Sequence, residues 1–158
     1  MQSAAQPSFL DRVVASLFAA CGIDTSFDAD VQSAVWEKVA FNAALNAMAT
    51  VTGLTVGGMD TEPGRRIAAA IVGEVVATAA AKGISVDADR IASKVDFALT
   101  HHRQHKASML QDRLAGRRTE IESINGAVAR EAATLGVPTP VTATLADLVR
   151  MNEPRDIG

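Results

Sequence analysis

Apolar residues recur at helical spacing along most of the chain, and no segment shows the strict alternation that is typical of a strand. The first helical segment follows Ser8, a residue suited to cap a helix because Asp11 stands three positions later. Its apolar stripe has the spacing i, i+3, i+4, i+7, i+8 and consists of Leu10, Val13, Val14, Leu17 and Phe18. Gly22 then predicts the end of this helix.

The second predicted helix runs from about Asp30 to Thr50 and carries three polar side chains at intervals of four residues, Lys38, Asn42 and Asn46. This spacing places them along one stripe of the helix. Their neighbours are almost all Val, Ala, Phe, Leu and Met, so the helix is expected to be mostly buried. An unpaired buried polar group costs about 1–3 kcal/mol, so this stripe needs partners, supplied by the protein or by a bound ligand.

Capping residues and glycines predict the remaining helices. A third helix opens at Asp60 or Thr61 with Pro63 and ends at Gly83. Asp87 is expected to cap a fourth helix. A short helix is expected from Ser108 to Gly116.

Two more helices complete the predicted fold. Thr119 with Glu122 forms the pattern of a capping box, which predicts a helix that closes at Gly136. Thr139 and Pro140 start the last helix. The predicted fold class is therefore all-α, a single domain of six to seven packed helices over residues 8–152, between a disordered lead-in (1–7) and a tail (153–158).

Composition narrows the possible functions. With 15 Lys and Arg against 18 Asp and Glu the net charge is −3, which offers no electrostatic reason to bind nucleic acid or an anionic membrane. The one cysteine, Cys21, excludes an internal disulfide, and its apolar helix face favours a core role over a nucleophile. No apolar run reaches the ~20 residues that span a bilayer, and a cytoplasmic location is predicted.

The common catalytic motifs are missing: no G-x-G-x-x-G follows a strand, and no G-x-S-x-G is present. The three histidines, His101, His102 and His105, cluster, and two of them could share a helix face and hold zinc. Arg103 and Lys106 among them oppose a cation, so a solvated polar turn is the favoured interpretation and no metal is assigned.

Several blocks of sequence, taken together, carry a family resemblance. They are Trp36-Glu-Lys38-x-x-x-Asn42-x-x-x-Asn46, Ser108-Met-Leu-Gln-Asp112, Gly116-Arg-Arg-Thr-Glu120-Ile-Glu-Ser-Ile-Asn125-Gly126 and Gly136-Val-Pro-Thr-Pro140. In this order they resemble the C-terminal domain of ketopantoate reductases (2-dehydropantoate 2-reductases) from about residue 8 to 150. The resemblance implies a helical domain of the 6-phosphogluconate dehydrogenase C-terminal type.

The resemblance also implies an activity, the NADPH-dependent reduction of ketopantoate to pantoate in pantothenate biosynthesis. It assigns Lys38 as the general acid toward the carbonyl oxygen and Glu120 to the active site near the substrate and nicotinamide. Asn42 and Asn46 would hold the substrate, and Ser108 would bind its carboxylate. These roles agree with the chemistry, because an ammonium stabilises the charge that hydride transfer places on oxygen, and Glu120 could pair with Lys38 and position it.

Without the resemblance, Lys38 and Glu120 also have a structural interpretation. Lys38 could extend its amine to solvent past apolar neighbours, and Glu120 could stabilise a helix N-terminus. A non-catalytic module for dimerisation or protein binding, with Lys38 and Glu120 as a structural ion pair, therefore stays open. So does a related reductase for another 2-oxo acid.

The resemblance implies a Rossmann domain ahead of the helical region, and the 158 residues contain none. We therefore expect the chain to be a fragment or a separately made domain of a longer reductase, and a free-standing protein is the alternative. NADPH would be bound mainly by such a domain, present as a partner in cis or in trans. The isolated chain is accordingly expected to lack reductase activity, and a homodimer is a further possible assembly.

Overall fold

A computed structural model describes residues 7–25 and 30–154 and contains only helices within them. The all-α prediction is confirmed. The elements are α1 (Phe9–Ala20), α2 (Val31–Thr52), the 3-10 helix η1 (Val56–Met59), α3 (Glu62–Ala81), α4 (Ala88–His101), α5 (Ser108–Leu114), α6 (Asn125–Thr134) and α7 (Pro140–Asn152). No helix in this part of the chain is both long and apolar enough to cross a membrane.

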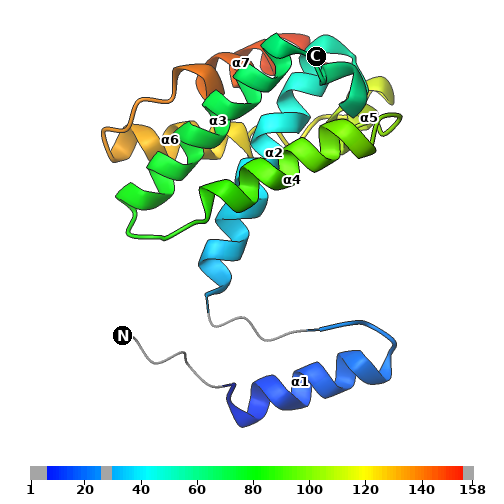
Figure 1. Cartoon of the computed structure of the whole chain (residues 1–158), viewed down its shortest axis with the longest axis vertical. Coiled ribbons are helices and arrows are strands. Elements are labelled where there is room, and N and C mark those ends of the chain that lie inside the picture. Colours follow the sequence, from blue (N-terminus) through cyan, green and yellow to red (C-terminus); the bar gives the residue numbers. More distant parts are fainter. Residues whose placement is uncertain (1–6, 26–29, 155–158) are drawn as a thin grey trace.

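Helix α2 is the centre of the bundle and packs against α3, α4, α5 and α7 (Figure 1). Its second half is buried among them, and Ala40, Ala43, Ala44 and Ala47 are fully inaccessible. Alanine at these positions lets the neighbouring helices approach closely, which explains the alanine-rich composition.

The first two turns of α2 do not follow the prediction of a mostly buried helix. Val31 and Val35 are about half exposed, and Lys38 is exposed as well. Burial becomes continuous only from Ala43 to Thr50. The prediction is wrong for these turns because the bundle covers the apolar stripe only along the second half of the helix.

Helix α1 has the predicted capping box and apolar stripe but no buried residue, and it lies apart from the bundle in Figure 1. The Ser8 side chain accepts from the Asp11 amide at 3.2 Å, which confirms the capping interaction. Phe9, Leu10 and Leu17 remain 77%, 69% and 64% exposed. Cys21, which follows α1, is exposed too, so the expectation of a core cysteine is wrong.

Most other predicted helix starts are confirmed by side-chain caps. Asp30, Thr61 and Asp87 each accept a hydrogen bond from the backbone amide three residues later, at the starts of α2, α3 and α4. Helix α7 is held differently, because the Glu74 carboxylate on α3 accepts from the amides of Val141 and Thr142 at 2.9 and 2.8 Å.

The capping box predicted at Thr119 and Glu122 is wrong. Residues 121–124 form turns, and α6 begins only at Asn125. The Thr119 amide and hydroxyl donate to Glu153, which follows α7, at 2.8 and 2.5 Å. Glu122 instead bonds to Arg130 and Arg150. The sequence pattern predicted that these two side chains would cap one helix locally. Each of them instead binds a residue from another part of the chain.

Candidate functional site

A pocket of about 310 Å³ lies where α2, the end of α4 and the start of α5 meet. Three residues that the sequence singled out, Asn42, Asn46 and Ser108, line it together. The apolar part of its wall consists of Phe41, Leu45, Val56, Ala98 and Ala107. The pocket thus combines a small apolar cavity with neutral polar groups from two helices.

Asn46 is the most informative residue of this pocket. It is only 7% exposed, and its side-chain amide has no hydrogen-bond partner among the residues that the structure describes. Asn42 is half-buried one turn earlier, and its amide is likewise unpaired within the described chain. An amide that borders a pocket and has no protein partner retains its capacity to hydrogen-bond a ligand there.

The loop between α4 and α5 closes one side of the pocket and is held by η1. The Val56 amide donates to the His105 carbonyl at 2.8 Å, and the Gly57 amide donates to the Arg103 carbonyl at 3.1 Å. A Cβ atom on Gly57 would lie 2.5 Å from the Cα atom of Arg103, so this contact requires glycine. His102 and His105, which this loop carries, both line the pocket.

Lys38 lies beside this pocket, in an adjoining groove of about 520 Å³ between α2 and α4. The groove shares Phe41, Ala98 and His102 with the pocket, so the two cavities are adjacent. The Lys38 amine forms no ion pair within the described ranges, and its side chain is exposed. An amine placed there can stabilise negative charge on a ligand that reaches from the pocket into the groove.

The acidic residue next to Lys38 was not assigned a role from sequence. Glu37 is 4% exposed and accepts two hydrogen bonds from Arg90 Nε on α4, at 3.1 and 3.0 Å. Lys94 lies 3.5 Å from the same carboxylate. Hydrogen bonding by Arg90 lowers the pKa of Glu37 below its ordinary value, against the opposing effect of burial. The sequence signal that could have revealed this ion pair is a charged residue within an otherwise apolar helix.

Glu120 is not brought to Lys38 by the structure. It lies in the exposed bend between α5 and α6, and its carboxylate forms no ion pair or hydrogen bond with any other described residue. It lines neither the pocket nor the groove. The expected contact with Lys38 is therefore not formed in this structure.

The histidine cluster provides no metal site, since no group of three His, Cys, Asp or Glu side chains among the described residues could hold an ion. His101 stacks on Phe97 with ring centroids 4.3 Å apart, and its Nδ1 lies 2.7 Å from the Thr100 hydroxyl. His102 contacts Phe97 edge-on and faces the pocket with His105. The three side chains therefore occupy different environments.

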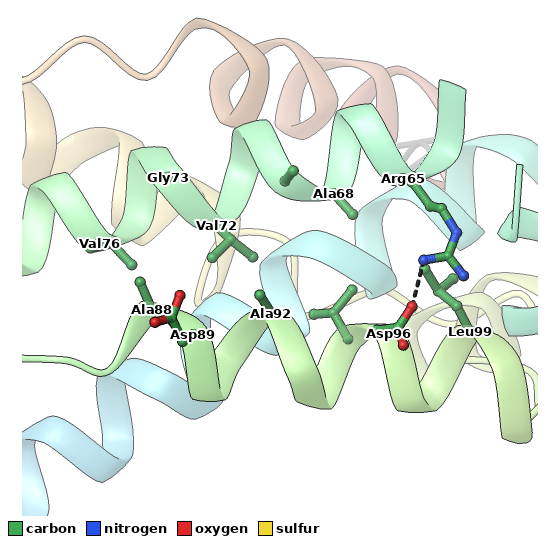
Figure 2. Close-up of a pocket in the computed structure, with 12 residues that line it drawn as sticks. Arg65, Ala68, Val72, Gly73, Val76, Ala88, Asp89, Ala92, Asp96 and Leu99 are labelled. Carbon is green, nitrogen blue, oxygen red and sulfur yellow. Dashed lines mark hydrogen bonds and ion pairs between the residues drawn. The ribbon is translucent and has the colours of Figure 1, made fainter. Parts of the chain in front are cut away.

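A larger cavity, about 530 Å³, lies between α3 and α4, where Figure 2 shows small and apolar side chains along both helices. Its one cation, Arg65, is paired with Asp96 and lies 2.7 Å from Asp60. Because Arg65 is already paired and the other charged residues of the lining, Asp89 and Asp96, are acidic, this cavity offers a small anion fewer partners than the pocket at Asn46 does.

Comparison with known proteins agrees with this arrangement. Residues 30–153 match the family model described as ketopantoate reductase PanE/ApbA C terminal. The chain is 37% identical over 139 residues to a 2-dehydropantoate 2-reductase of Halobacterium salinarum, covering 87% of this chain and 46% of the relative. It is 31% identical over 140 residues to one of Archaeoglobus fulgidus, covering 88% and 47%. The chain thus spans about half the length of these curated relatives.

Solved structures show the same fold. A PanE/ApbA family ketopantoate reductase from Ralstonia eutropha superimposes with a TM-score of 0.84 at 32% identity, covering 92% of this chain and 49% of that one. A D-mandelate dehydrogenase with NADH and anilino(oxo)acetate gives a TM-score of 0.86 at 25% identity, covering 90% and 60%. Because the family model matches most of the chain, this protein belongs to the ketopantoate reductase family, and its residues 30–153 form the C-terminal domain of that family.

Proposed function

We propose that this chain is the substrate-binding domain of an NADPH-dependent 2-dehydropantoate 2-reductase, which converts ketopantoate to pantoate for pantothenate biosynthesis. One observation carries the proposal: Asn42, Asn46 and Ser108 line one pocket, and the amide of Asn46 is nearly buried without a protein partner. Two amides and a hydroxyl are suited to hold the carbonyl and carboxylate oxygens of a 2-oxo acid in a fixed orientation.

In the proposed reaction the 2-oxo acid occupies the pocket with its carbonyl oxygen toward Lys38. NADPH, when bound, supplies the hydride that reaches the carbonyl carbon. The Lys38 ammonium stabilises the negative charge that develops on oxygen and donates the proton that completes the hydroxyl group. The ion pair of the buried Glu37 carboxylate with Arg90 holds this part of α2 against α4. Asn42, Asn46 and Ser108 keep the substrate in place while the charge moves.

NADPH requires a second binding unit in this proposal. The described residues contain no strand, and therefore no strand–glycine–helix turn for the phosphates of a dinucleotide. The groove at Lys38 borders the pocket and leaves space for the reactive end of a cofactor. We assign the remaining contacts to a Rossmann domain in cis or in trans, and expect no reductase activity without it. Glu120, whose carboxylate has no partner among the described residues, keeps its proposed place near the substrate and nicotinamide in that assembly.

The proposal can be tested by binding of 2-dehydropantoate to the 158-residue chain, followed by NMR of the asparagine side-chain amides. We expect saturable shifts for Asn42 and Asn46, and loss of binding in Asn46→Ala. Asn152→Ala is the matched control, because Asn152 is exposed at the end of α7 and its side chain donates to the Leu148 carbonyl, its one partner among the described residues. Equal affinity in both variants would contradict the proposed pocket.

A helical interaction module is the second candidate, and the exposed face of α1 favours it. Phe9, Leu10 and Leu17 together form an apolar surface that no described residue covers. Such a surface can bind the proposed nucleotide-binding domain or another copy of this chain. Sedimentation at increasing protein concentration separates the two, since only self-association would shift the monomer to a dimer.

A further inference from the structure

We infer that His105, together with His102, binds the carboxylate group of the substrate and makes the pocket selective for a 2-oxo acid anion. This inference rests on the proposed function and adds two recognition residues to it. Both histidines line the pocket that Asn42, Asn46 and Ser108 also line. The sequence alone predicts a solvated turn at these histidines and gives neither a role in the site.

The charge of the substrate gives the first argument. Asn42, Asn46 and Ser108 are neutral, so they can hydrogen-bond a carboxylate without balancing its charge. Gln111, another polar residue of the wall, already donates its side-chain amide to the Lys106 carbonyl at 2.7 Å. Lys38 lines the adjoining groove, where the proposed reaction assigns its amine to the carbonyl oxygen. Among the residues that line the pocket itself, the histidines alone can carry a positive charge.

The backbone of the loop gives the second argument, because hydrogen bonds fix the main chain from which both imidazole rings project. The His105 amide donates to the His102 carbonyl at 2.9 Å, and the His102 amide donates to Ala98 at 2.9 Å. The His105 carbonyl in turn accepts from Val56 at 2.8 Å. A binding residue on a loop whose main chain is already hydrogen-bonded loses less conformational entropy on binding than a residue on a flexible loop.

The third histidine of the cluster provides an internal control. His101 does not line the pocket, its ring stacks on Phe97, and its Nδ1 is engaged by the Thr100 hydroxyl at 2.7 Å. It has the same side chain as His105 and is four residues away in sequence. Any general effect of removing an exposed imidazole should therefore appear in His101→Ala as well.

The experiment measures binding of 3-methyl-2-oxobutanoate and its neutral methyl ester to the 158-residue chain by NMR titration. We expect the wild type to bind the acid more tightly than the ester. His105→Ala and His102→Ala should each weaken acid binding about tenfold, the size of one hydrogen bond to a charged group, and leave ester binding unchanged. His101→Ala should match the wild type, and His105→Arg should keep the preference for the acid because a guanidinium at this position can also bind a carboxylate.

The outcomes separate this inference from the proposed function. Unchanged ester binding shows that an alanine variant is folded with its pocket intact. If the wild type binds the acid and both alanine variants keep its preference over the ester, the histidine inference is overturned while the substrate pocket stands. If the wild type binds neither compound, the proposed function fails, and this inference fails with it.

Discussion

Glu37 and Arg90 form a two-point ion pair that joins α2 to α4 at the residue before Lys38. The Glu37 carboxylate is nearly inaccessible to solvent, whereas the Arg90 side chain is 54% exposed. The pair therefore sets the position of the helix turn that carries the proposed general acid. The described partners of the buried Glu37 carboxylate are Arg90, Lys94 and the Asp87 amide, and all three belong to α4 or to the residue that caps it.

Replacing Glu37 with Gln should destabilise the fold by about 1–3 kcal/mol, because a charged hydrogen-bond acceptor is lost at a buried position. Urea denaturation at pH 7 measures the change. Glu62→Gln is the control, since Glu62 pairs with Arg66 on an exposed helix face at 86% side-chain exposure and should contribute little. Equal stability losses in the two variants would show that burial of Glu37 has no energetic consequence.

Glu122 should make stability depend on pH in the acid range. Its hydrogen bonds to Arg150 and Arg130 lower the pKa from 4.5 to about 2. A carboxyl with a lowered folded-state pKa contributes stability above its unfolded value, and this contribution is lost as the pH falls from about 4.5 to about 2. The side chain is 55% exposed, so solvent screening limits the effect to about 1 kcal/mol. The unfolding free energies of wild type and Glu122→Gln should differ at pH 6 and converge near pH 2. A difference that does not change with pH would show that the ionisation of Glu122 does not contribute to stability.

Gly57→Ala should distort the loop that carries His102 and His105. The new methyl group would lie 2.5 Å from the Cα atom of Arg103, a backbone contact that must shift. We expect a loss of about 1–3 kcal/mol in unfolding free energy together with weaker 2-oxo acid binding. Gly73→Ala is the control: its Cβ atom would contact nothing within 4 Å, and alanine inside α3 should stabilise by about 0.5–1 kcal/mol. Denaturation and ligand titration of both variants check this prediction.

Removing residues 1–29 should leave the stability of the bundle almost unchanged, because α1 buries none of its residues. We expect a change in unfolding free energy within about 0.5 kcal/mol, as for surface changes in general. If the apolar face of α1 binds a second copy, the truncated chain should stay monomeric at concentrations where the 158-residue chain forms dimers. A large loss of stability on truncation would show that α1 packs on the bundle in solution.

Lys38→Met should mainly reduce kcat in a reductase assembled with its nucleotide-binding half. Loss of the ammonium removes stabilisation of the developing oxyanion, which is expected to cost about 2–4 kcal/mol in the transition state. Lys106→Met provides the control, because Lys106 is an exposed residue of the α4–α5 loop that lines neither the pocket nor the groove. Steady-state kinetics with NADPH would exclude the acid role if both variants kept the activity of the wild type.

Local features of the chain were sufficient to predict most helices. Asp30, Thr61 and Asp87 cap the helices that follow them, and each cap involves a side chain and an amide only three residues apart. The spacing of Asn42 and Asn46 likewise places them on one face of α2, whatever surrounds that helix. Because both partners of such an interaction lie within a few residues of each other, the interaction can be recognised in the sequence.

Contacts between distant segments could not be predicted in this way. Thr119 has the neighbours of a helix cap, but its hydroxyl donates to Glu153, 34 residues away. The apolar stripe of α1 resembles that of a buried helix, yet nothing in the described chain covers it. Periodicity shows which face of a helix is apolar, and packing alone shows whether that face is covered. The sequence therefore established the helices and the polar stripe of the pocket, whereas the burial of Glu37, the separation of Glu120 from Lys38 and the placement of the histidines depend on how the helices pack.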